Sequence, residues 1–167
     1  MSDNKSKLNF EIDGAVFSSD RKMRYLLWRK LSEGKKKLLV IGLNPSTATE
    51  TENDATIRRC IGFSREWGYG SLVVANLFAY RATKPADMRK AIDPIGRDND
   101  SWLIWASQYA DLTLAAWGND GLWRNRHRDV HPLLVSPQCL GITTRGAPRH
   151  PLYVLGATKP VPFEGGL

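Results

Sequence analysis

The sequence predicts an α/β protein, a three-layer α/β/α sandwich with a mainly parallel central sheet. Two short apolar runs, "LLVIGL" and "SLVVANLFA", have the length and composition of strands that are covered on both faces. Segments with helix signals separate such runs, so strand and helix alternate along the chain. Polar residues follow the runs directly, at the edge of the sheet where ligands bind in proteins of this class.

Chain length sets the number of domains. A chain of 167 residues, 42% of them hydrophobic, can build one core but not two comfortable ones. We therefore expect a single α/β domain over residues 8–167. Residues 1–7 are polar, and we expect them to form a flexible N-terminus.

The first third of the chain contains two edge elements and one central strand. Residues 8–17 alternate apolar and polar side chains with a break at Asp13-Gly14, which predicts an edge hairpin. Residues 24–30 fit either a strand or a short helix, and the pattern does not separate the two. Residues 38–43 predict a central parallel strand.

The rest of the chain alternates helices and strands. Asp54 can cap a helix that runs to about Trp67, and Gly68 can end it. Pro85 suits the first turn of another helix. The remaining expected elements are strands at 71–76, 111–117 and 139–143, a helix at 99–109, and a helical stretch at 122–135 that Pro132 interrupts.

The charge balance favours an anionic partner. Lys and Arg number 24 against 17 Asp and Glu, which gives a formal net charge of +7. Such an excess attracts polyanions through counterion release and electrostatic steering. We expect a nucleic acid, with DNA favoured over RNA, or a nucleotide as the partner. Nothing in the sequence indicates the oligomeric state.

Metal and cofactor signals are weak. Cys60 and Cys139 lie far apart without a C-x-x-C spacing, so neither a disulfide framework nor a cysteine metal site is indicated. His127 and His131 have the i, i+4 spacing of a helical metal pair, but no third ligand is evident, and a solvated helix face explains them better. We expect no metal and no cofactor.

The sequence also favours a soluble, cytoplasmic protein without a membrane partner. No apolar run approaches the roughly 20 residues that span a bilayer. The opening "MSDNKSKLNF" lacks the apolar core of a signal peptide. Two distant cysteines suit a reducing compartment.

Polar groups converge at the predicted strand ends. Asn44, Pro45, Ser46 and Thr47 follow one strand, Asn76 ends the next, and "TRGAPRHPLY" with His150 follows the last. These positions share one rim of a parallel sheet, which predicts one pocket. The competing interpretation is structural: an Asn-Pro turn that bonds its own backbone, and a histidine that precedes a proline-started helix.

Basic residues around this rim have two interpretations. Arg58 and Arg59 lie near a helix start, where they either contact phosphates or are simply exposed. Arg149 is a further candidate for a phosphate contact. The run "WRNRHR" at 123–128 mixes an aromatic residue with cations, as nucleic-acid surfaces do, although a solvated helix face explains it as well. Asp98 and Asp100 are better explained as helix-capping residues than as a catalytic pair.

Long motifs carry a family resemblance. The order "GLNPSTA", "DATIRRCIGFSREWGYGSLVVANLFAYRAT", "DPIGRDND", "AAWG" and "RHPLY" closely resembles the bacterial and phage domain-of-unknown-function family sixteen forty-three. The likeness extends from about Ser19 to Tyr153. It supplies a family without supplying a function.

A fainter resemblance concerns chemistry. Gly42-Leu43-Asn44-Pro45 looks like the G-x-N-P motif of mismatch-specific uracil-DNA glycosylases, and His150-Pro151 looks like the H-P motif of that superfamily. The resemblance implies a uracil-DNA glycosylase-like fold. It also implies that Asn44 positions the attacking water, that Asn76 reads a pyrimidine edge, and that His150 stabilises the departing base.

The resulting hypothesis is a uracil-DNA-glycosylase-like enzyme that hydrolyses the N-glycosidic bond of a normal or modified nucleobase in DNA. Such a hydrolase needs a held water and a donor aimed at the departing base. The expected catalytic residues are Asn44 and His150, and the expected substrate-binding residues are Pro45, Ser46, Thr47, Asn76, Arg58, Arg59 and Arg149.

Whether the protein is an enzyme is left open by the sequence. The alternative is a catalytically silent nucleic-acid or nucleotide-binding module, linked to phage conflict. A third possibility is another hydrolase or transferase that acts on a small nucleotide. The segment "STATETENDATIRR" lacks the stacking aromatic residue of the glycosylases, and Leu152 and Tyr153 follow the H-P motif in place of a small residue.

Overall fold

A computed structural model describes the backbone of residues 2–165 and the side chains of residues 5–165. Its centre is a seven-stranded sheet in the order β1-β2-β4-β3-β5-β6-β7. The strands are β1 (Gly14–Phe17), β2 (Arg24–Lys30), β3 (Lys37–Gly42), β4 (Ser71–Asn76), β5 (Leu112–Ala115), β6 (Gln138–Cys139) and β7 (Val161–Pro162). The four strands β4, β3, β5 and β6 are parallel to one another. The outer pairs β1/β2, β2/β4 and β6/β7 are antiparallel, so the sheet is mixed, with a parallel centre.

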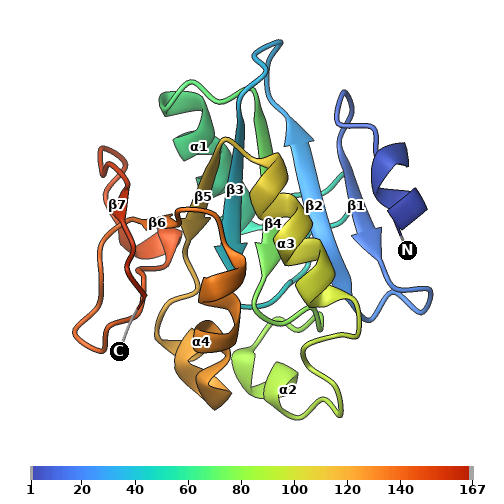
Figure 1. Ribbon diagram of the computed structural model, residues 1–167, viewed down its shortest axis with the longest axis vertical. Helices are drawn as coiled ribbons and strands as arrows, with labels where there is room; N and C mark the ends of the chain where they lie inside the picture. The colour runs from blue at the N-terminus through green and yellow to red at the C-terminus, as the bar shows by residue number, and fades with distance from the viewer. Residues whose placement is uncertain (1, 166–167) are drawn as a thin grey trace.

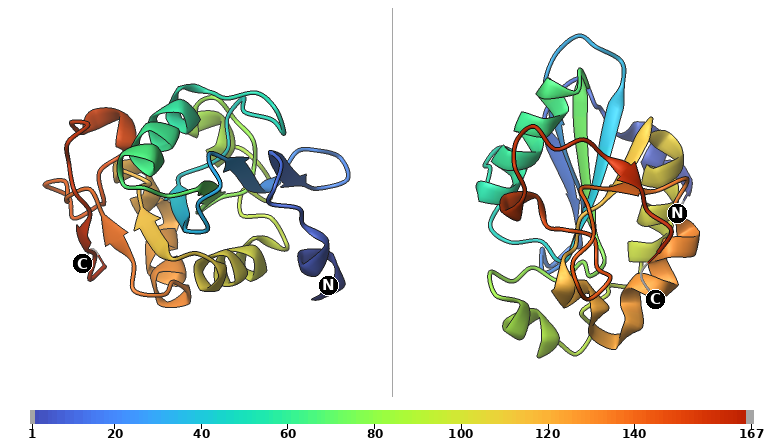
Figure 2. Two further views of the ribbon diagram at one scale, coloured as in Figure 1. Left: turned by 90° about the horizontal axis from the view of Figure 1, so that it is seen from above. Right: turned by 90° about the vertical axis from the view of Figure 1, so that its left-hand side faces the viewer.

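Helices cover both faces of this sheet. Figure 2 shows α1 (Ala55–Glu66) on one face, with α3 (Asn99–Tyr109) and α4 (Arg126–Val130) on the other. Each face has its own apolar core: Ile57 and Phe63 of α1 pack in one, and Trp102 and Leu103 of α3 pack in the other. The α/β class and its three layers therefore agree with the sequence prediction.

Strand order creates a crevice at one end of the sheet. The chain passes from β3 through α1 to β4 on one side, and then crosses back over β3 to β5 by way of α3 on the opposite face. The loops after β3 and β5 therefore diverge, and ligands bind at such points in open α/β sheets. In Figure 1 these carboxyl ends point downward, toward α2 (Pro85–Arg89) and α4.

Several local predictions are confirmed. The Asp54 side chain caps α1 by accepting a hydrogen bond from the Ile57 amide, and Gly68 follows its end with a φ of +75°. Pro85 begins α2, and α3 has the predicted bounds. The ambiguous segment 24–30 is strand β2.

Other local predictions are wrong. The edge hairpin joins β1 to β2 and is not contained within residues 8–17. The stretch 122–135 is broken into a 3-10 helix (Asn119–Asn125), α4 and a second 3-10 turn (His131–Leu133), because Arg124 and Asn125 adopt positive φ values. The last strand of the parallel set is shorter than expected, and β7 was not anticipated.

The first described residues of the chain contact α3. Residues Ser2–Lys7 form a short 3-10 helix, and the Lys5 ammonium donates to the Ser101 carbonyl over 2.8 Å. Another 3-10 turn, Pro151–Tyr153, follows His150. Over residues 2–165, no helix is both long enough and apolar enough to span a bilayer.

Candidate functional site at the carboxyl ends of the parallel strands

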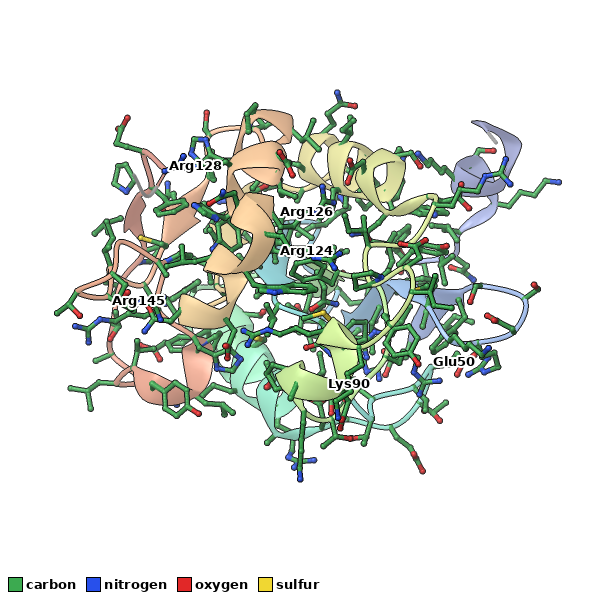
Figure 3. The ribbon with its side chains drawn as sticks, turned by 90° about the horizontal axis from the view of Figure 1, so that it is seen from below. Glu50, Lys90, Arg124, Arg126, Arg128 and Arg145 are labelled. Carbon is green, nitrogen blue, oxygen red and sulfur yellow. The ribbon has the colours of Figure 1, made fainter. Side chains whose placement is uncertain are left out.

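A pocket of about 800 Å³ opens where the loops diverge. Its walls come from the segments after β3, β4, β5 and β6 and from the first turn of α1. Figure 3 looks onto this end of the molecule, where the labelled cations Lys90, Arg124, Arg128 and Arg145 are spread over several segments. The pocket thus lies at the switch point of the sheet.

Asn44 holds the walls of the pocket together. Its side-chain amide donates to three backbone carbonyls: Pro45 at 3.0 Å, Tyr80 at 3.4 Å and Ala82 at 2.8 Å. These bonds join the loop after β3 to the loop after β4. The amide nitrogen is therefore committed to the protein, whereas Oδ1 makes no hydrogen bond within residues 2–165 and remains able to accept one.

Asn76, at the end of β4, presents an unused donor. Its side chain is 4% exposed and lines the pocket, and its Nδ2 has no hydrogen-bond partner among the described residues. The side chain lies over Gly42 on the neighbouring strand, where a Cβ added to the glycine would approach Asn76 Oδ1 to 2.8 Å. A buried amide donor without an acceptor costs roughly 1 to 3 kcal/mol, so a ligand that supplies the acceptor would recover that free energy.

The backbone around Asn76 is fixed from behind. Asn99 is fully buried, and its amide donates to the carbonyls of Asn76 and Leu77, each at 3.0 Å. The Arg126 Nε also donates to the Leu77 carbonyl at 3.0 Å, and its guanidinium pairs with Asp100. Asn99 and Asp100, which the sequence indicated only as helix-start residues, therefore set the orientation of the strand end.

His150 lines the pocket opposite the sheet, with one defined tautomer. Its Nδ1 accepts a hydrogen bond from the Leu152 amide at 3.3 Å, so the proton of the neutral ring lies on Nε2. Burial lowers the His150 pKa below its usual value, and the charge of Asp54 partly opposes that shift. The ring is therefore neutral at physiological pH, with Nε2 as a donor.

Arg59 positions the segment that carries His150. The Arg59 guanidinium donates to the carbonyls of Pro151 and Val154 and lies over the ring of Phe63 at 4.7 Å. These contacts tie α1 to the 3-10 turn after His150. Arg59 does not line the pocket, and neither does Arg58, which is exposed and donates to the Asn53 carbonyl.

The remaining predicted residues divide between the pocket and its surroundings. Ser46 and Arg149 line the pocket together with Asn44, Asn76 and His150. Pro45 is buried, and its carbonyl accepts the Ala82 amide, while Thr47 is exposed; neither lines the pocket.

Three charged groups of the pocket were not predicted as site residues: Arg24, Asp54 and Asp120, the last of which pairs with Arg89. Arg24 at the start of β2 is 2% exposed, and the only hydrogen bond of its side chain within the described chain joins Nη1 to the Ala48 carbonyl at 3.0 Å. Burial lowers the Arg24 pKa to about 10, so it stays charged at neutral pH. Asp54 was predicted only as a helix cap, yet it also lines the pocket. The available signal for Arg24 was a cation inside the apolar run "RYLLW".

A register shift aims Arg24 at the pocket. The β1/β2 pairing moves from Val16↔Leu26 to Phe17↔Arg24, which leaves Tyr25 as an extra residue. Tyr25 and Leu26 then belong to the same apolar cluster, although successive residues of a regular strand point to opposite faces. Such bulges re-aim side chains, and this one turns Arg24 away from that cluster.

The structure offers no metal ligand set in the chain from residue 2 to 165: no group of three or more His, Cys, Asp or Glu residues is arranged to hold an ion. His127 is buried in α4, and His131 bonds the Phe163 carbonyl at 3.1 Å. Cys60 lines the pocket as a buried thiol, and burial raises its pKa to about 12, which leaves it protonated.

Comparison with protein families gives one match. The profile of the family described as "Protein of unknown function (DUF1643)" matches residues 24–152, which contain every pocket element except the last turn at Tyr153. The chain belongs to this family. Neither the curated proteins nor the solved structures provide a match.

Proposed function

We propose that the pocket binds a nucleobase and that the protein hydrolyses its N-glycosidic bond, as a uracil-DNA-glycosylase-like enzyme acting on DNA. The observation that carries this proposal is the buried, unpaired amide of Asn76 in the same pocket as the Nε2 donor of His150. The likeness of the motifs at Asn44 and His150 to those of the glycosylase superfamily supports it as well.

Asn76 suits recognition of a base edge. An amide offers a donor and an acceptor side by side, which matches a ring edge that carries a carbonyl next to an N–H group. Because the Asn76 backbone is held by Asn99, the side chain is preorganised for one orientation of the ring. A base of the wrong edge pattern would leave a buried donor unpaired, and such mismatches discriminate strongly.

His150 suits stabilisation of the leaving group. When the glycosidic bond breaks, its electron pair stays with the base, and negative charge grows on the ring. The Nε2–H of a neutral His150 donates to that charge, and the bond from Leu152 keeps the ring in the required tautomer.

Water addition has two candidate supports. Asn44 Oδ1 can accept a hydrogen bond from a water and so orient it. The Asp54 carboxylate accepts the Ile57 amide through Oδ1, which leaves Oδ2 for the same water. The glycosidic bond breaks, hydroxyl from the water adds to the sugar carbon, and the proton of that water passes to Asp54. Asp54 then releases this proton through solvent to the departing base anion, so one water is divided between the sugar and the base.

The binding-module hypothesis keeps one supporting observation. The Asn44 side-chain amide donates to three backbone carbonyls, as a structural turn would require. A silent module would bind nucleic acid or nucleotide through the same pocket but release no base.

The deciding experiment incubates the protein with oligonucleotides that carry a panel of altered bases and measures abasic sites by alkaline cleavage. We expect His150→Ala to lower base release by roughly 100- to 1000-fold, as for loss of one preorganised donor. Asn76→Ala should lower it comparably. The matched control is Gln108→Ala, an exposed amide on α3 outside the pocket. Tight binding without abasic product from any substrate would favour the silent module.

A further inference from the structure

We infer that the pocket contains a phosphate-binding subsite, formed by the Arg24 guanidinium and the N-terminus of α1. The ligand would therefore enter with a phosphate attached. That this phosphate belongs to a nucleotide rests on the proposed function, whereas the anion subsite rests only on the groups described below.

Arg24 is a buried cation with too few partners. It is 2% exposed and its guanidinium makes one hydrogen bond, while its Nε is buried without a partner and its Nη2 makes no hydrogen bond within residues 2–165. Arg29 lies on the same strand with the same exposed fraction, and its three nitrogens make five hydrogen bonds. A buried charge requires compensation, and Arg24 lacks it from the protein.

The start of α1 supplies further donors at the same place. The helix has 12 residues, and its first three, Ala55, Thr56 and Ile57, line the pocket beside Arg24. Asp54 caps only the Ile57 amide, so the amides of Ala55 and Thr56 have no acceptor among the described residues. Free amides and the helix dipole favour an anion at such a terminus.

The pocket lining holds two arginines, Arg24 and Arg149, and two aspartates, Asp54 and Asp120, and Asp120 is already paired with Arg89. Arg29 and Arg81 both act on Arg24 as like charges, against the single carboxylate of Asp54. No ion pair joins Arg24 to Asp54 in the part of the chain that is described, so the carboxylate offsets the cation only from a distance. Arg149, exposed on the opposite wall, adds a further cation. A phosphate complements this arrangement because its several oxygens can accept from Nη2 and both amides.

Burial of Arg24 limits how the phosphate arrives. Its side chain is 2% exposed and lines the pocket, so a phosphate that contacts it occupies the same pocket as the proposed base. Two sources share this chemistry: the terminal phosphate of a mononucleotide, and the phosphodiester beside a base that is flipped out of a strand.

The test measures binding by calorimetry with three probes: deoxyuridine, deoxyuridine monophosphate, and a single-stranded oligonucleotide that contains deoxyuridine. In the wild type we expect the monophosphate to bind roughly 10- to 100-fold more tightly than the nucleoside, as charged hydrogen bonds allow. Arg24→Met should remove this difference, and Arg24→Lys should restore part of it. Dependence on Arg24 for the monophosphate alone would assign the terminal phosphate, and dependence for the oligonucleotide would assign the phosphodiester.

A second substitution tests the sign of the charge. Asp54→Asn keeps a good helix cap but removes the negative charge, so it should tighten monophosphate binding while leaving nucleoside binding unchanged. Arg65→Met is the matched control, since Arg65 is exposed in the last turn of α1, away from the pocket. Far-ultraviolet circular dichroism and thermal melting verify that each variant is folded.

Equal affinities for nucleoside and monophosphate in the wild type would overturn the subsite. So would a phosphate preference that survives in folded Arg24→Met. Base release is measured separately: phosphate-dependent binding without abasic product contradicts the glycosylase proposal and leaves the subsite standing, while base release without a phosphate preference does the reverse.

Discussion

Arg29 and Arg24 occupy the same strand at the same depth and have different partners. Arg29 donates to the carbonyls of four residues and to the Asn53 side chain. Arg24 donates to one carbonyl and faces the pocket. Burial alone therefore does not distinguish a structural cation from a ligand-directed one; the number of satisfied donors does.

The same contrast explains the polar stretch between β3 and α1. This stretch supplies Arg29 with the carbonyls of Thr49, Glu50 and Glu52. It wraps around a buried cation and so needs backbone acceptors rather than apolar side chains. Its first part, at Asn44 and Ser46, faces the pocket instead.

The largest expected effect comes from substituting Arg29, the structural arginine of the pair. Arg29→Met should lower the free energy of unfolding by about 3 to 5 kcal/mol, because it leaves five buried or partly buried acceptors without their donor. Arg24→Met should change it by less than about 1 kcal/mol in the absence of ligand, since a poorly compensated charge is removed. Urea denaturation measures both. Equal losses would show that the two arginines are both structural.

A smaller effect concerns the unpaired amide of Asn76. Gly42→Ala places a Cβ 2.8 Å from Asn76 Oδ1 and should displace that side chain. We expect a loss of about 1 to 3 kcal/mol in stability, typical of overpacking, together with loss of ligand binding. Gly62→Ala is the control: it lies inside α1 with nothing within 4 Å of the added Cβ, and should stabilise the protein by about 0.5 to 1 kcal/mol. Normal ligand affinity in Gly42→Ala would remove Asn76 from the site.

Substitutions of Asp54 separate its role as a helix cap from its proposed role in accepting the proton of water. Asp54→Ala should destabilise the protein by about 1 kcal/mol through loss of the cap, and Asp54→Asn by less. Base release should fall in both variants, because neither retains a carboxylate to take the proton from water. Parallel thermal melting and abasic-site assays separate the two roles. If Asp54→Asn releases base at the wild-type rate, Asp54 is only a cap.

The smallest expected effect tests, on a group outside the pocket, whether a buried polar side chain without hydrogen-bond partners indicates a ligand. His127 is 4% exposed, and neither ring nitrogen has a hydrogen-bond partner within the described residues. Burial, assisted by Arg128, lowers its pKa below the usual 6.5, and the Gly121 backbone and Asp129 oppose that shift. The unfolded chain then binds the proton more readily, so stability is full above pH 6.5, falls as the pH drops below it, and levels off under the folded-state pKa.

His127→Leu should reduce this acid sensitivity without changing ligand affinity. Denaturation at about pH 7.5 and about pH 5, on either side of the ordinary histidine pKa, measures the first quantity. Calorimetry at the higher pH measures the second. A change in affinity would extend the ligand-binding region to α4.

The sequence was sufficient where one local signal dominates. The Asp54 cap, Pro85 at the start of α2 and the apolar runs of β3 and β4 each act through neighbouring residues, and their elements were predicted. Asn44, Asn76 and His150 could be placed on one rim because parallel strand ends meet there. Their individual roles in chemistry stay predictions.

What could not be predicted depends on distant contacts. The break near Arg124 and Asn125 rests on backbone angles that their side chains do not demand. Arg24 belonged to a segment that fitted either a strand or a helix. The bulge at Tyr25, which directs Arg24 to the pocket, was not evident from the sequence. The engagement of Arg59 with Pro151 and Val154 joins residues more than 90 positions apart.

The bulge at Tyr25 shifts the alternation of side chains along β2 by one residue. Its one extra residue decides toward which face of the sheet the preceding side chain, Arg24, points. Deletion of Tyr25 would put the Arg24 side chain where the tyrosine now packs, among apolar residues such as Leu26 and Leu103. The chain would then have to bury a full charge among apolar side chains or shift the β1/β2 register by one residue. A single missing codon, with no change to any pocket residue, would therefore erase the cation from the pocket.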